Sequence, residues 1–100
     1  MVRAAAQEER FYVVAYDIGD DRRRAKVHKT LLAFGKWTQY SLFECFLTDK
    51  QRVQMRAELD KHLDPALDSV RLYQLCAGCL TKTETVGRLD APAPDVTYIV

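Results

Sequence analysis

The chain has 100 residues, 48% hydrophobic and 29% charged, which suits one globular domain and excludes a disordered chain, a collagen or a coiled coil. No apolar run approaches the roughly 20 residues of a bilayer span, and residues 1–10 lack the apolar centre of a signal peptide. The net charge is only +1, but six basic residues and one acidic residue lie in the segment 21–36. We therefore expect a small soluble cytoplasmic protein without a membrane partner. Its basic segment suits phosphate backbones, although a solvated helix face is the ordinary alternative.

The first half of the chain predicts a strand, a helix and a longer strand. Residues 11–16 are apolar or aromatic throughout, which is typical of a central strand covered on both sides. A turn with glycine and aspartate follows, and apolar residues then recur at helical spacing over 22–34. Gly35 is a natural end for this helix. Residues 38–47 alternate like a single longer strand.

The second half predicts a helix and two further strands. Thr48 and Gln51 have the spacing of a capping box, so we expect a helix to begin there. We expect it to end near Asp64 and Pro65, because proline cannot continue a helix. Residues 69–75 form a third predicted strand, and residues 80–86, rich in threonine, a plausible fourth. A β-α-β-β-α-β order would arise only if the segment 38–47 bends or splits.

Two helices on one face of an antiparallel sheet give an α+β fold of ferredoxin-like type, and we expect it to span residues 1–87. Residues 88–95 include two prolines and are typical of an extended linker. Residues 96–100 are strand-prone and need a sheet edge to join, their own or a partner's. We expect the terminal strand to be exchanged or added at a sheet edge in a two-fold dimer, with a frayed tail as the alternative.

Cys76 and Cys79 form a C-x-x-C motif. A structural zinc site normally has four ligands, and no second pair accompanies this one. A redox pair is the other use of such a motif. The sequence favours a third interpretation, that these are small buried thiols beside a turn.

Asp17 is the most informative candidate for chemistry. It follows an apolar strand and precedes a helix N-terminus, where ligands and phosphates often bind. A carboxylate and a phosphate repel each other unless a hard cation lies between them, and Mg²⁺ accepts one or two carboxylates. A symmetric dimer would supply a second Asp17. The alternative is that Asp17, Asp20 and Asp21 are only turn and cap residues.

Several motifs over residues 11–87 carry a family resemblance. They are Tyr16-Asp17-Ile18, Asp20-Asp21-Arg22-Arg23 with Lys26-Val27, Phe34-Gly35, Gln39-Tyr40-Ser41-Leu42-Phe43-Glu44-Cys45, Asp68-Ser69-Val70-Arg71, and Leu75-Cys76 with Cys79. Their combination resembles the CRISPR-associated protein 2 family. The resemblance implies a ferredoxin-like homodimer whose C-terminal strand crosses to the partner's sheet.

The resemblance also implies an activity. It implies a Mg²⁺-dependent endonuclease acting on RNA, or on double-stranded DNA, which serves spacer acquisition in CRISPR antiviral defence and bridges the CRISPR-associated integrase. The metal-binding and catalytic aspartate of the family falls on Asp17. The nucleic-acid-binding positions fall on Tyr16, Arg22, Arg23, Arg24, Lys26, Ser41 and Phe43.

One departure from the family pattern is Trp37, where many members carry an arginine. We expect Trp37 to pack rather than to bind a base. A guanidinium contact to phosphate is then lost, unless Lys36 compensates as a point charge, and this departure speaks against the nuclease interpretation more than against the DNA-bridging one. Two alternatives remain open. One is a non-catalytic nucleic-acid scaffold and adaptor for the integrase, and the other is a toxin-like ribonuclease of similar fold.

Overall fold

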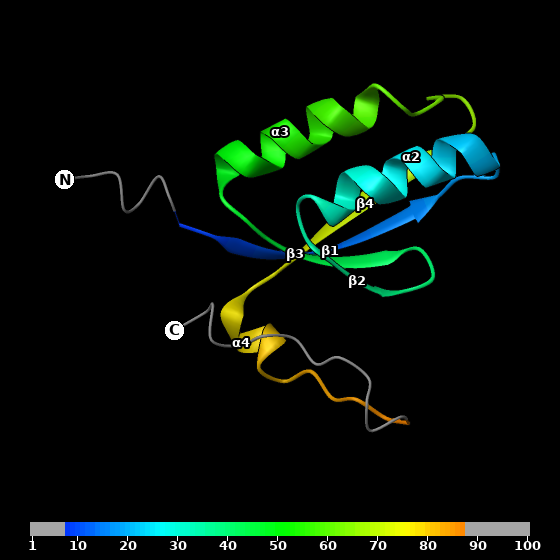
Figure 1. Cartoon of the computed structure of the whole chain (residues 1–100). Helices are drawn as coiled ribbons and strands as arrows, with labels where there is room; N and C mark the ends of the chain where they lie inside the picture. The colour runs from blue at the N-terminus through cyan, green and yellow to red at the C-terminus, as the bar shows by residue number, and fades with distance from the viewer. Residues whose placement is uncertain (1–7, 88–100) are drawn as a thin grey trace.

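The computed structural model describes residues 8–87 and forms a four-stranded antiparallel sheet in the order β2-β3-β1-β4. Figure 1 shows α2 and α3 side by side on one face of this sheet. The elements are β1 (Arg10–Asp17), α2 (Asp21–Leu32), β2 (Lys36–Gln39), β3 (Leu42–Leu47), α3 (Asp49–Asp60), β4 (Ser69–Leu75) and α4 (Ala77–Leu80). The predicted α+β, ferredoxin-like fold is confirmed.

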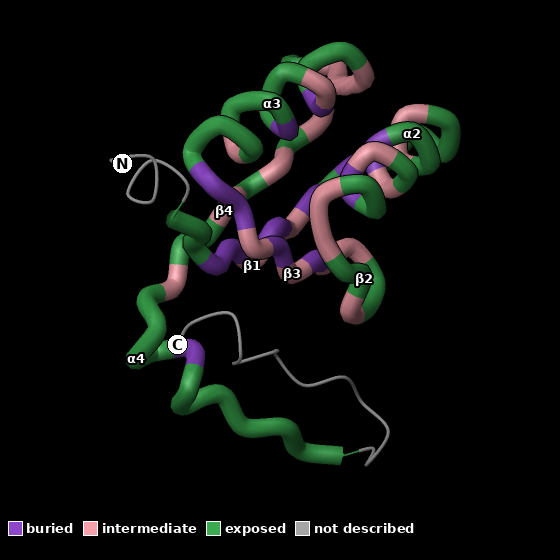
Figure 2. Tube along the Cα trace, turned by 60° about the vertical axis from the view of Figure 1, so that its left-hand side comes forward, coloured by how far each residue is buried: buried purple, intermediate pink, exposed green. Residues whose placement is uncertain are grey.

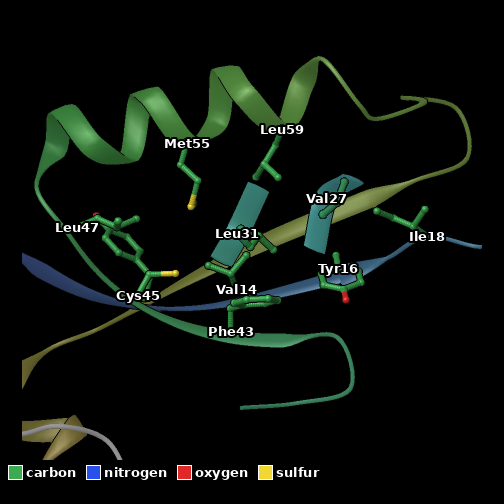
Figure 3. Packing of buried hydrophobic residues seen from close by; sticks show 11 residues of the cluster. Val14, Tyr16, Ile18, Val27, Leu31, Phe43, Cys45, Leu47, Met55 and Leu59 are labelled. Atoms are coloured by element: carbon green, nitrogen blue, oxygen red, sulfur yellow. The ribbon is translucent and has the colours of Figure 1, made fainter. Parts of the chain in front are cut away.

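The main core lies between the sheet and the two long helices. Strands point alternate residues to opposite faces, so every second residue of β1 and β3 meets the helices. Figure 3 shows these side chains converging from both layers. The buried members are Tyr12, Val14 and Tyr16 of β1, Ile18 after it, Val27 and Leu31 of α2, Phe43, Cys45 and Leu47 of β3, and Met55 and Leu59 of α3.

Side-chain caps begin both long helices. The Asp20 carboxylate accepts a hydrogen bond from the backbone N–H of Arg23 at 2.9 Å and caps α2. Thr48 and Gln51 form the predicted capping box of α3. α3 ends at Asp60, before the expected end near residues 64–65. The backbone N–H groups of Lys61 and His62 donate to carbonyls three residues earlier, as in a 3₁₀ turn, and this ends the α-helical pattern.

The segment 38–47 differs from its prediction, because it is not one strand. β2 and β3 form a hairpin, and Tyr40 in its turn has a φ of 45°. The indole N–H of Trp37 donates to the Tyr40 carbonyl at 2.8 Å and holds this turn. The split produces the β-α-β-β-α-β order that the sequence left open.

The predicted strand over 80–86 is also wrong. The chain forms the short helix α4, and the described residues 81–87 contain no strand. Figures 1 and 2 place α4 on the side of the sheet opposite α2 and α3, and the side chain of Leu80 is buried there. The expected linker 88–95 and terminal strand 96–100 lie outside the described residues. Within residues 8–87, no helix is long and apolar enough to cross a membrane.

Candidate functional site

Asp17 lies exposed at the end of β1, opposite Ser69 of β4. Its carboxylate makes no hydrogen bond or ion pair with any described residue. The two neighbouring aspartates do have structural roles, since Asp20 caps α2 and Asp21 pairs with Arg24. Of the three acidic residues in this region, only Asp17 has no role in holding the turn or the helix.

Tyr16 points to the opposite face, into the core beneath α2. Its hydroxyl is hydrogen-bonded to Nδ1 of His28 at 3.2 Å, and burial raises the pKa of this phenol. The His28 ring also packs edge-on against Phe43 and Trp37, with centroids 5.0 and 5.8 Å apart. The backbone N–H of Tyr16 donates to the Ser41 carbonyl at 3.1 Å. The site region therefore includes His28, which the sequence placed on a helix but did not single out.

Phe43 and Tyr16 do not present their side chains to solvent. Phe43 is completely buried and Tyr16 nearly so, and Figure 3 shows both rings within the core. The expectation that Phe43 binds nucleic acid directly does not fit this position, because a ring packed between sheet and helix cannot reach a ligand without unfolding. Ser41 is half-buried in the hairpin turn beside them.

Arg23 is held by a partner distant in the sequence. Its guanidinium donates two hydrogen bonds to the carboxylate of Asp68, from Nε at 2.7 Å and from a terminal nitrogen at 3.2 Å. The Asp68 side chain is fully buried and also accepts the backbone N–H of Asp64. Such bidentate pairs are among the stronger polar contacts in proteins. The predicted nucleic-acid contact of Arg23 therefore competes with a contact that holds the fold together.

Arg24 is also engaged within the chain. It donates to the Ile18 carbonyl at 3.0 Å and pairs with Asp21. The basic residues of α2 without such partners in the described structure are Arg22, Lys26 and Lys29. They are four and three positions apart, which places them on one face of α2. We call these three residues the α2 basic stripe. Lys29 belongs to this stripe, although it is not among the nucleic-acid-binding positions predicted from the sequence.

The metal-binding capacity of one protomer is small. Residues 8–87 contain no group of three or more His, Cys, Asp or Glu side chains that could hold a metal ion. A single carboxylate such as that of Asp17 is compatible with a water-rich ion such as Mg²⁺, which binds proteins through one or two carboxylates. Cys76 and Cys79 are exposed, so the prediction of buried thiols is wrong for them, whereas Cys45 is buried.

Comparison with known proteins agrees with this architecture. The family model described as CRISPR associated protein Cas2 matches residues 10–83. A protein of Chloroflexus aurantiacus named "CRISPR-associated endoribonuclease Cas2 1" is 38% identical over 94 residues, covering 90% of this chain and 99% of that protein.

Two solved structures share the fold over most of the chain. A hypothetical protein from Thermus thermophilus superposes with a TM-score of 0.77 at 34% identity, covering 87% of this chain and 99% of that one. Streptococcus pyogenes Cas2 superposes with a TM-score of 0.69 at 29% identity, covering 77% and 99%. On the family match and these relatives together, the chain belongs to the CRISPR-associated Cas2 protein family.

Proposed function

We propose that this protein is a metal-dependent endonuclease of RNA, or of double-stranded DNA, that serves spacer acquisition in CRISPR adaptation. The observation that carries the proposal is the exposed carboxylate of Asp17, which lacks a partner within residues 8–87. The names of relatives such as the Chloroflexus endoribonuclease support the class of activity. The proposed catalytic and metal-binding residue is Asp17, and the proposed metal is Mg²⁺.

The proposal requires a homodimer, because one carboxylate supplies few ligands. Both long helices cover the same face of the sheet, and an uncovered sheet face normally packs against another layer. Pairing two sheets would let a two-fold axis relate the Asp17 residues. Mg²⁺ at this position would stabilise charge on a phosphodiester and lower the pKa of a bound water.

The chain's own residues would bind and orient the substrate. The α2 basic stripe begins with Arg22 in the first turn of α2, five residues after Asp17. It can therefore hold a nucleic-acid backbone that reaches Asp17. Arg24, which donates to the Ile18 carbonyl, would keep the turn between β1 and α2 in shape, and Arg23 would hold α2 to the loop before β4 through Asp68. Tyr16 of β1 and His28 of α2, which are hydrogen-bonded to each other, would hold the end of β1 against the helix.

An Asp17→Asn variant tests the catalytic assignment. We expect Mg²⁺-dependent cleavage of single-stranded RNA and duplex DNA to fall at least about 10–100-fold, the range seen when even outer-shell partners of metal ligands are changed. Asp60→Asn is the matched control, because Asp60 is also exposed and makes no described ion pair. Equal cleavage by wild type and Asp17→Asn, in preparations whose activity co-purifies with the protein, would refute the assignment.

A non-catalytic scaffold that bridges the CRISPR-associated integrase on duplex DNA is the second candidate. The observation favouring it is the α2 basic stripe, whose three side chains are available for phosphates. A purified integrase assay separates the two functions. Spacer integration that survives Asp17→Asn while cleavage is lost would assign the biological role to the scaffold.

Salt dependence tests the stripe itself. Replacing Arg22, Lys26 and Lys29 by alanine should weaken duplex binding and reduce the slope of log affinity against log salt by about 0.9 for each phosphate that the variant no longer neutralises. Arg52→Ala with Arg56→Ala on α3 is the control, because these arginines also lack described partners but lie on the other helix. An unchanged slope in the triple variant would exclude α2 from the interface.

A further inference from the structure

Cys76 and Cys79 lie in one exposed turn where β4 leaves the sheet. Cys76 is the N-cap residue of α4, and its sulfur accepts a hydrogen bond from the backbone N–H of Cys79 at 3.4 Å. Both thiols are free and exposed, whereas the third cysteine, Cys45, is buried in the core. The structure therefore brings two accessible sulfur atoms to the same turn.

The two thiols are not equivalent. The pKa of Cys76 is lowered because hydrogen bonds stabilise its thiolate. The backbone N–H of Cys79 has the larger effect and the Cys79 thiol the smaller one. Donating to that sulfur raises the pKa of Cys79. Burial raises the pKa of Cys45 to about 12. Because the thiolate is the reactive form, Cys76 is the best nucleophile of the three.

Access to the pair is open. Cys76, Ala77, Gly78 and Cys79 are all exposed, so the turn is open to solvent. The pair is also remote from the candidate nuclease site. Leu75 pairs with Phe11 at the start of β1, whereas Asp17 stands at the other end of that strand. Chemistry at the cysteines therefore does not involve the residues assigned to phosphodiester cleavage.

We propose that Cys76 and Cys79 form a thiol–disulfide exchange site that closes reversibly into an intrachain disulfide. The oxidant is a low-molecular-weight disulfide such as oxidised glutathione. The Cys76 thiolate attacks one sulfur of the oxidant, which forms a mixed disulfide and releases one glutathione thiolate. Cys79 then loses its proton and attacks the Cys76 sulfur, forming the Cys76–Cys79 bond and releasing the second glutathione. The protein loses two electrons and two protons, and the oxidant becomes two thiols.

Mass spectrometry of the full chain tests this proposal. The fully reduced protein is incubated with oxidised glutathione under anaerobic conditions, trapped by acid and alkylated. We expect the mass to fall by two hydrogen atoms, a peptide map to join Cys76 to Cys79, and Cys45 to be alkylated only after denaturation. Added dithiothreitol should restore the reduced mass.

Two variants separate the roles of the pair. Cys79→Ser removes the second attack, so a glutathione adduct should accumulate on Cys76. Cys76→Ser leaves the less reactive thiol, so its adduct should form several-fold more slowly. The proposal is overturned by a glutathione adduct that persists in the wild-type protein, by a disulfide between two copies, or by reaction of Cys45 in the native state. These readouts do not depend on nuclease activity.

Discussion

The side chain of Asp68 is closed to solvent and pairs with one arginine, although the residue as a whole is only partly buried. Two hydrogen bonds from the Arg23 guanidinium and one from the Asp64 backbone saturate it. Removing one partner of such a pair leaves the other polar group unpaired, which destabilises a fold more than the intact pair stabilises it. We therefore assign Arg23 to the stability of the fold.

Asp68→Asn should lower the free energy of unfolding at neutral pH and change its pH dependence. The hydrogen bond from Arg23 lowers the pKa of Asp68 in the folded state. Its stabilising contribution is therefore complete above the ordinary aspartate pKa of about 3.9 and is lost as the pH falls through the lower folded-state value. Urea unfolding of both proteins from neutral to acidic pH measures this effect.

The difference between wild type and Asp68→Asn should shrink as the pH falls below that ordinary value. Asp60→Asn serves as the control, because Asp60 is exposed and has no described partner, and it should follow the wild type throughout. A difference of constant size across the whole pH range would contradict the assignment of this acid sensitivity to Asp68.

Individual site residues were predictable from the sequence to different degrees. The place of Asp17 after an apolar strand was readable from the sequence, whereas its exposure and its lack of a described partner are visible only in the structure. The pairing of Arg23 was not visible, because its partner lies 45 positions away and charge alone does not identify a contact. Burial of Phe43 depends on which face of its strand meets the helices, and the hairpin determines that.

At the scale of elements, the two long helices were more predictable than the hairpin or the short helix α4. Helix starts depend on local caps such as Thr48 with Gln51, which are readable from spacing. The hairpin turn contains Tyr40, not the glycine or asparagine that usually accepts a positive φ. Its stabilising contact is the indole N–H of Trp37, a signal that no common turn pattern includes. The alternating residues around it therefore resembled one continuous strand.

Gly35→Ala tests the close approach between the end of α2 and β3. A Cβ at this position would lie 2.6 Å from the Glu44 carbonyl oxygen and would also meet the Cys45 sulfur. Backbone cannot move aside as a flexible side chain does, so we expect a destabilisation of about 1–3 kcal/mol, the usual cost of overpacking. Chemical denaturation followed by circular dichroism measures it.

Gly19→Ala is the control for this substitution. No atom lies within 4 Å of its added Cβ, so the free energy of unfolding should change by no more than about 0.5 kcal/mol. Equal stability of the two variants would show that the Gly35 contact relaxes without cost.

At the scale of the whole molecule, the two faces of the sheet are unequal. The face toward α2 and α3 is buried, whereas the opposite face carries side chains that are only partly covered, although α4 lies on that side (Figure 2). Those on the central strands include Val13, Ala15, Leu42 and Phe46, and Tyr73 of β4 is 49% exposed. Glu44 and Arg71 also lie on this face, opposite Val13 and Ala15. A largely apolar sheet face of this kind is typical of a surface that a second copy covers.

Tyr73→Glu should convert the proposed homodimer into a monomer without unfolding it. The new carboxylate would be desolvated between two sheets, and its symmetry mate would add like-charge repulsion. Analytical ultracentrifugation should report the monomer mass, and circular dichroism should remain that of the folded protein. Cleavage should be lost together with the dimer, because the two Asp17 carboxylates would separate. Val53→Glu on α3 replaces another exposed apolar side chain on the helical side and should leave both mass and activity unchanged. A folded, monomeric and fully active Tyr73→Glu would show that one Asp17 is sufficient for catalysis.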